Sequence, residues 1–177
     1  MKKISFLVFI LSITISSQNY WERVGVRLAN VNQLIINSDG YIFAGTDRGV
    51  FRSTNNGDSW DEKYDDYTDR NISAIDINSN NDIFIAIYEF LPPIVTHRMY
   101  RSTDNGESWV ELNNLYVSYL NINSNNNIFA GTTNGVLRST DNGVNWSEVN
   151  NGLIPSFVSC IGINSIDYIF VSSDSKM

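Results

Sequence analysis

The chain has 177 residues and a formal net charge of −7 at pH 7. This acidic balance argues against binding to nucleic acid or to anionic membrane surfaces, because both attract basic proteins. The single cysteine excludes a disulfide within the chain, so an apolar core and hydrogen-bonded strands must hold the fold together.

The first 17 residues have the pattern of a secretory signal peptide. Lys2 and Lys3 form a basic start, residues 4–15 are mostly apolar, and Ser16 and Ser17 supply small residues for cleavage. The apolar run is shorter than the roughly 20 residues of a spanning helix; the alternative is an uncleaved membrane anchor. We therefore expect residues 18–177 to be secreted, periplasmic or on the cell surface, with no membrane segment after cleavage.

One eight-residue pattern occurs three times, at residues 53–60, 102–109 and 139–146. Each octet begins with Ser-Thr, has Asp or Asn at its third position and Gly at its fifth, and ends in Trp. The recurring residues are Ser53, Asn55, Gly57 and Trp60, then Ser102, Asp104, Gly106 and Trp109, and finally Ser139, Asp141, Gly143 and Trp146.

A second pattern recurs around a phenylalanine. Its copies contain Phe43, Phe84, Phe129 and Phe170, at spacings of 41, 45 and 41 residues. From this Phe to the octet Trp is 17 residues in the first and third copies and 25 in the second, so the second copy carries an eight-residue insertion before Arg101. A period near 40 residues is typical of propeller blades.

Each repeat contains short runs of Ile, Val, Phe, Tyr and Trp, separated by turns of Asn, Ser, Asp and Gly. The pattern predicts an all-β propeller of four-stranded antiparallel blades. The expected blades span residues 31–63, 72–113 and 117–150, with half a blade at 158–173 and a stray outer strand at 20–24. About three and a half blades make an incomplete ring.

We interpret this incomplete ring as the product of a truncated gene, a fragment or a C-terminally incomplete product. The alternative is a half-ring that closes by dimerising. Self-association through the open propeller edges is expected, since they expose unpaired backbone groups and an apolar blade face. Cys160 lies in the apolar stretch 157–163, so we expect it to be a buried small hydrophobe.

The octets match the motif Ser-x-Asp-x-Gly-x-x-Trp, fully in the second and third copies and with Asn55 in place of Asp in the first. The chain thus resembles the Asp-box, or BNR-repeat, β-propeller family. It is most similar to secreted bacterial members related to the sialidase-like and photosystem-assembly-factor-like propellers. The resemblance covers residues 20–173 and implies the fold, but not an activity, because the family contains both enzymes and non-enzymes.

We interpret the octets as structural turns between the third and fourth strands. A short Asp or Asn side chain accepts hydrogen bonds from nearby backbone N–H groups, Gly permits a positive φ, and Trp buries a large ring. The competing hypothesis is ligand or calcium binding by the octet carboxylates. Asn55 favours the structural interpretation, because an amide keeps the acceptor oxygen and lacks the charge.

Residues 76–82 imitate the oxygen spacing of a calcium loop. Asn81 replaces the required Gly, however, and Ile87 replaces the required Glu. The other repeats have similar Asn-rich segments at the same place, so this segment is expected to be the turn between the first two strands. We therefore expect neither a metal site nor a cofactor.

In an antiparallel meander of four strands, the turns between the first and second strands (1–2 turns) and the octets lie at one end of a blade. The loops between the second and third strands (2–3 loops) and the crossovers from the fourth strand to the first strand of the next blade (4–1 crossovers) lie at the other end. The second end carries the length variation, and loops on a rigid scaffold commonly bind ligands. The candidate binding residues there are Tyr64, Asp65, Asp66, Tyr67, Asp69, Tyr88, Glu89, Phe90 and His97. They suit an unknown protein or carbohydrate ligand. The alternative is a solvated acidic loop and a Pro-stiffened hairpin tip.

No catalytic constellation is evident. Sialidase-like hydrolysis needs an arginine triad, but Arg52, Arg101 and Arg138 each precede an octet Ser and are a repeat feature of the third strand. The sequence therefore favours an exported non-enzymatic scaffold or binding module. The alternative is a glycoside hydrolase, sialidase-like or of another Asp-box type, of which this chain is a fragment; a non-functional remnant is a third interpretation.

Overall fold

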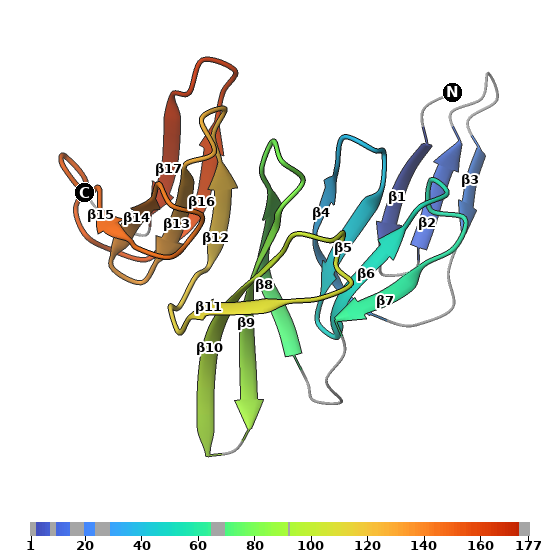
Figure 1. Ribbon diagram of the computed structural model, residues 1–177, viewed down its shortest axis with the longest axis horizontal. Helices are drawn as coiled ribbons and strands as arrows, with labels where there is room; N and C mark the ends of the chain where they lie inside the picture. The colour runs from blue at the N-terminus through green and yellow to red at the C-terminus, as the bar shows by residue number, and fades with distance from the viewer. Residues whose placement is uncertain are drawn as a thin grey trace.

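A computed structural model describes residues 3–7, 10–14, 20–23, 29–64, 70–91 and 93–173. Over residues 29–173 three four-stranded antiparallel sheets and a two-stranded one lie side by side in an arc (Figure 1). Each four-stranded sheet is a meander whose strands pair in chain order. The predicted all-β fold, an incomplete ring of four-stranded blades, is confirmed.

The strand bounds follow the repeats. The first blade holds β4 (Val31–Ile36), β5 (Ile42–Thr46), β6 (Gly49–Ser53) and β7 (Asp61–Tyr64). The second holds β8 (Arg70–Ile77), β9 (Ile83–Leu91), β10 (Ile94–Ser102) and β11 (Val110–Asn113). The third holds β12 (Tyr119–Ile122), β13 (Ile128–Thr132), β14 (Gly135–Ser139) and β15 (Ser147–Glu148), and the partial fourth holds β16 (Val158–Ile163) and β17 (Ile169–Ser173).

A three-stranded sheet precedes the first blade. It contains β1 (Lys3–Leu7), β2 (Ile10–Thr14) and β3 (Tyr20–Arg23), and β3 pairs with β2. The expected outer strand at 20–24 is thus a strand over its described part, with partners from the segment predicted to be a signal peptide. That signal peptide stays a prediction, and residues 1–2, 8–9, 15–19 and 24 lie outside the described residues. No helix in the described ranges has the length and apolar character of a membrane span.

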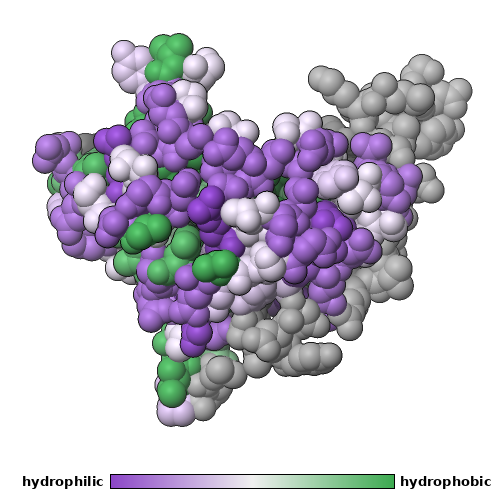
Figure 2. Space-filling view, viewed as in Figure 1, coloured by the Kyte–Doolittle hydropathy of each residue, from purple (hydrophilic) through white to green (hydrophobic). Residues whose placement is uncertain are grey.

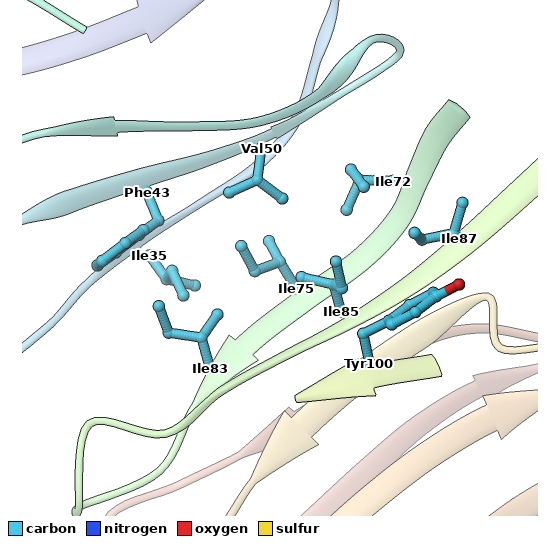
Figure 3. Close-up of a cluster of buried hydrophobic side chains, with 9 residues drawn as sticks. All are labelled: Ile35, Phe43, Val50, Ile72, Ile75, Ile83, Ile85, Ile87 and Tyr100. Atoms are coloured by element: carbon cyan, nitrogen blue, oxygen red, sulfur yellow. The ribbon is translucent and has the colours of Figure 1, made fainter. Parts of the chain in front are cut away.

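The recurring phenylalanines form the contacts between blades. Phe43 of the first blade is fully buried in a cluster with Ile72 and Ile75 of the second (Figure 3). Phe84 and Phe129 occupy equivalent places in the clusters that join the second blade to the third and the third to the fourth. Each blade therefore inserts one ring into its successor, which explains the spacing of the Phe pattern.

Glycine allows the blades to approach closely at two equivalent positions. A Cβ atom on Gly45 would lie 2.8 Å from Cγ2 of Ile72, and one on Gly131 would lie 2.7 Å from Cγ1 of Val158. Real Cβ atoms essentially never come so close to another heavy atom. The Ala-Gly pair in strands β5 and β13 is therefore required by packing against the next blade.

Repeated hydrogen bonds join the inner strands of neighbouring blades. The Oγ of Ser73 donates to the carbonyl of Val117 at 2.8 Å, and the Oγ of Ser118 donates to that of Val158 at 2.6 Å. Asn32 makes the equivalent bond to Ile72 at 2.8 Å. These side chains satisfy carbonyl groups in the innermost strands or, for Val117, just before one, so a polar residue recurs at this position.

The expectation that Cys160 is buried is wrong, because the structure leaves it exposed. Val158 and Ile161 of the same strand pack against the third blade. Cys160 faces the opposite side, as Phe170 does, and Phe170 is 63% exposed. In the described part of the chain no further blade lies against this face, so its apolar residues have no cover.

Candidate functional site

The second octet shows what its polar residues do. The backbone N–H of Gly106 donates to the Oγ of Ser102 at 2.9 Å, and that of Ser108 donates to Oδ1 of Asp104 at 2.9 Å. The hydrogen bonds from Ser108 hold the pKa of Asp104 below its ordinary value. The carboxylate is thus engaged by its own turn.

The other two octets repeat this geometry. Ser59 N–H donates to the side-chain oxygen of Asn55 at 2.9 Å, and Asn145 N–H donates to Asp141 at 2.8 Å. The glycines have positive φ, as the structural interpretation requires, and so do the preceding residues Asn56, Asn105 and Asn142. The sequence reasoning missed these asparagines, although Asn tolerates the left-handed region better than other non-glycine residues.

The second octet is also anchored to the first blade. Nη1 of Arg52 donates to the carbonyl of Asn105 at 2.9 Å, and Glu107 forms ion pairs with Arg52 at 2.9 Å and Lys63 at 2.7 Å. The indole N–H of Trp109 donates to the carbonyl of Lys63 at 3.1 Å, whereas the other two octet Trp rings donate within their own turns. At this end of the blades, the polar side chains of the second octet therefore contact other residues of the propeller.

Arg101 forms an ion pair within its own blade, because its Nη2 lies 2.6 Å from Oδ2 of Asp82. Asp82 belongs to the turn that resembles a calcium loop. In that turn Oδ1 of Asn78 accepts the N–H groups of Asn80 and Asp82, both at 2.9 Å. Asn81 has a φ of 65° and takes the place of Gly40 in the first copy. The side-chain oxygens of this segment are therefore used within the turn at Asn78 and by Arg101 at Asp82. That of Asn81 is used by the first blade, because it accepts the N–H of Ser38 at 3.1 Å.

Across the described ranges no group of three or more His, Cys, Asp or Glu residues is placed to hold a metal ion. Asp76 has the most strongly shifted carboxyl pKa that is resolved there. Burial raises its pKa from 3.8 to about 6, although its oxygens accept the N–H groups of Ile77 and Ile122, both at 2.8 Å. Asp76 thus links the inner strands of two blades and is held in place by both.

The insertion in the second repeat forms a long hairpin. Strands β9 and β10 extend well beyond the other strands at the end of the blades that carries the crossovers (Figure 1). Apolar side chains gather at the lower tip of the molecule in this view (Figure 2), and Phe90, Ile94 and Val95 are exposed there. The insertion thus forms a hairpin tip, with Pro93 in its turn.

The hairpin presents two different faces. Phe90 pairs with Val95 and Tyr88 pairs with His97, so these four side chains share the face directed toward the third blade. Glu89 lies on the other face, is buried, and accepts a hydrogen bond from Thr96 at 2.8 Å. Three of the four predicted residues on this hairpin therefore lie together, and Glu89 does not join them.

A crossover residue that the sequence reasoning missed completes the aromatic face. The His97 ring lies 4.6 Å from that of Tyr116 in an edge-to-face arrangement and 5.4 Å from that of Tyr88. Burial among these rings lowers the pKa of His97. Tyr116 lies in the crossover between β11 and β12. The sequence could have indicated it, because the predicted topology places this crossover at the same end of the blades as the hairpin. We call Tyr88, Phe90, Val95, His97 and Tyr116 the aromatic face.

The remaining candidates do not belong to this face. The ring of Tyr64 packs between the first two blades, 5.3 Å from Tyr100 and 5.7 Å from Trp109. Asp65, Asp66, Tyr67 and Asp69 lie outside the described residues. Of the candidate residues in the acidic crossover, Tyr64 alone is therefore described by the structure, and it is an interface residue.

Two hollows lie at different places in the described structure. One of about 270 Å³ lies between Asn114 and residues 95–98 of β10. The other, of about 480 Å³, lies between the third blade and β17, and its lining includes Phe129, Leu153 and Val171. Trp146 and Leu137 pack into the corresponding cluster between the second and third blades. The larger hollow is thus a blade interface that the two strands of the fourth blade only partly fill.

No protein-family model and no curated protein matches this chain. Solved structures do. The extracellular domain of BT4673 from B. thetaiotaomicron superposes with a TM-score of 0.74 at 12% identity, over 97% of this chain and 24% of that one. The structure of YCF48 bound to D1 peptide superposes with a TM-score of 0.65 at 18% identity, over 92% of this chain and 54% of that one.

Virginiamycin B lyase from Staphylococcus aureus, solved with quinupristin, gives a TM-score of 0.61 at 20% identity, over 96% of this chain and 64% of that one. The chain spans less than two thirds of the length of each of these structures. At such identities the likeness shows the fold alone. The described blades therefore have the β-propeller fold and match parts of these propellers.

Proposed function

We propose that this chain is an exported, non-enzymatic propeller module of the Asp-box type that binds a protein or carbohydrate partner through its aromatic face. The observation that carries the proposal is the contact of His97 with Tyr88 and Tyr116, beside the exposed Phe90. Aromatic rings gathered on and beside a protruding hairpin suit sugar rings and peptide side chains.

The distribution of carboxylates favours binding over hydrolysis. A glycosidase of the usual kind needs two carboxyl groups that flank a bond. Asp104 and Asp141 accept hydrogen bonds within their octets, Asp82 pairs with Arg101, and Asp76 accepts two backbone N–H groups. Glycoside hydrolysis remains the alternative, with Glu89 as the carboxylate nearest to the aromatic face in sequence.

Export is supported by the pattern of residues 1–17 and by the likeness to an extracellular domain. Binding of a polypeptide is supported by the likeness to YCF48, whose structure holds a D1 peptide. The Asp-box assignment rests on the octet motif and on the three matching turns.

The test applies the full chain, labelled with a fluorophore, to a glycan array and to an array of unstructured peptides. Phe90→Ser is compared with Val144→Ser, which removes a similarly exposed apolar side chain from the third octet, at the opposite end of the blades. We expect the retained fluorescence to fall at least about tenfold for Phe90→Ser, because an aromatic side chain that becomes buried on binding dominates such contacts. We expect the fluorescence to persist for Val144→Ser. Equal loss in both variants, or no binding on either array, would contradict the proposal.

A panel of sialosides and β-glucans tests the alternative. Turnover by the full chain that disappears in Glu89→Gln and persists in Phe90→Ser would replace the binding function with hydrolysis.

A further inference from the structure

The outer edge of the long hairpin lacks a strand partner over half of its length. Strand β10 pairs with β9 from Ile94 to Ser102, but β11 pairs with it only between Met99 and Arg101. Among the described residues, segment 94–98 therefore has a strand on one side only. The third strands of the first and third blades are five residues long, so no comparable extension exists there.

Such an edge is a template for another strand. In an antiparallel ladder alternate residues direct their N–H and C=O groups away from the existing partner. Proteins usually protect long edges with Lys, bulges or very short strands. Segment 94–98 contains no Lys, its one formally charged side chain, Arg98, is paired with Glu111, and it pairs with β9 without a register shift; Ile94 and Val95 are 60% and 45% exposed.

The two sides of the edge differ in chemistry. Val95 and His97 belong to the aromatic face, whereas Thr96 and Arg98 point to the other side, where Arg98 forms an ion pair with Glu111 at 3.0 Å. A strand added beside β10 would place alternate side chains on the aromatic face and the intervening ones beside Thr96 and Arg98. Apolar residues fit the first set, and a hydroxyl or carboxylate fits the second.

The structure also provides room for such a strand. The hollow of about 270 Å³ is lined by residues 95–98 of β10 on one side and by Asn114 of the crossover on the other. It therefore lies along the edge. The hairpin extends beyond the other strands (Figure 1), so a chain on this edge can continue past Ile94 at the tip, whereas β11 occupies the edge from Met99 onward.

We propose that the edge of β10 from Ile94 to Arg98 binds an extended peptide as an added strand. The peptide has apolar side chains at alternate positions, directed to the aromatic face, and a carboxylate between them that faces Arg98. This inference rests on the proposed binding function and specifies its ligand class and its mode of recognition, in which backbone hydrogen bonds supply affinity and alternate side chains supply selectivity.

The probe is a synthetic heptapeptide with valine at its odd positions, threonine at its second and sixth, and glutamate at its centre. Calorimetric titration into the full chain measures its affinity. The matched probe carries N-methyl groups on alternate amides, which leaves the side chains unchanged and removes one row of donors. We expect it to bind at least about tenfold more weakly, because several backbone hydrogen bonds cannot form.

The matched protein variant removes only the hairpin extension. Residues 88–98 are replaced by the Thr-Asn-Gly of residues 133–135, which joins the equivalent strands of the third blade, and the buried Ile87 is kept. We expect this variant to keep its thermal transition and to lose the peptide. With wild-type chain, hydrogen exchange of the amides of residues 94–98 slows on peptide binding.

Three results would overturn the inference. Equal affinity for the plain and the N-methylated peptide would show recognition by side chains alone, so that strand addition fails while the proposed function stands. A wild-type dimer that becomes monomeric in the hairpin variant would show that a second copy of this chain occupies the edge. Absence of peptide binding would refute strand addition irrespective of the array results.

Discussion

Gly131→Ala tests whether close approach of the blades explains the repeated Ala-Gly pair. The new Cβ would lie 2.7 Å from Cγ1 and 3.1 Å from Cβ of Val158, so the third and fourth blades must separate or Val158 must move. Overpacking of this kind costs about 1–3 kcal/mol in unfolding free energy. For a chain of this size that loss lowers the melting temperature by roughly 2–12 °C.

Gly162→Ala is the matched control. Gly162 also lies in a strand, and a Cβ there would meet no heavy atom within 4 Å. We expect this variant to be unchanged or more stable by up to about 1 kcal/mol, because alanine restricts the unfolded chain. Urea unfolding followed by tryptophan fluorescence gives both free energies.

A double variant sharpens the test. Val158→Ala removes the atom that collides, so Gly131→Ala should cost less in that background than in the wild type. If Gly131→Ala is as stable as Gly162→Ala, or if its cost is the same in both backgrounds, the explanation of the Ala-Gly pair by interblade packing is refuted.

Two further predictions concern the core and the buried carboxyl. Phe84→Ala should lower the unfolding free energy by about 3–5 kcal/mol. Phe170→Ala, at the equivalent but exposed position, should change it by less than about 0.5 kcal/mol. Similar losses of unfolding free energy in urea titrations of the two variants would contradict the role of the Phe84 ring between blades. The pKa of Asp76 is raised in the folded state to about 6, so folding takes up a proton between pH 4 and 6 and wild-type stability should fall as the pH rises through this window. Asp76→Asn should remove this dependence, and a urea midpoint that shows the same pH slope in both proteins would disprove it.

The blade architecture could be predicted from the sequence because it depends on neighbours in the chain. A meander needs only short strands, turns of suitable residues, and a period that recurs. The octets and the Phe pattern display all three, and they located an eight-residue insertion between Phe84 and Arg101, where the structure has the long β9–β10 hairpin.

The contacts between blades could not be predicted in the same way. Trp60, Trp109 and Trp146 are equivalent in sequence, but Trp109 alone donates to the preceding blade, since Lys63 presents its carbonyl there. Cys160 was expected to be buried, because an alternating apolar strand does not reveal whether a further sheet covers its second face.

The candidate site shows the same division. The sequence identified the variable end of the blades and placed Tyr88, Phe90 and His97 on it. Only the tertiary structure brought Tyr116 to His97, turned Glu89 to the other face and moved Tyr64 into the interface between the first two blades. It also exposed the edge of β10, which depends on where β11 stops pairing.

By itself the sequence determined the repeat, the strands and the turn chemistry, because each of these is decided within about 40 residues of chain by side-chain alternation and short-range hydrogen bonds. The tertiary structure decided which faces are covered and which edges remain open. Coverage is a property of the neighbouring blade, and a residue in one repeat carries no information about the shape of the next.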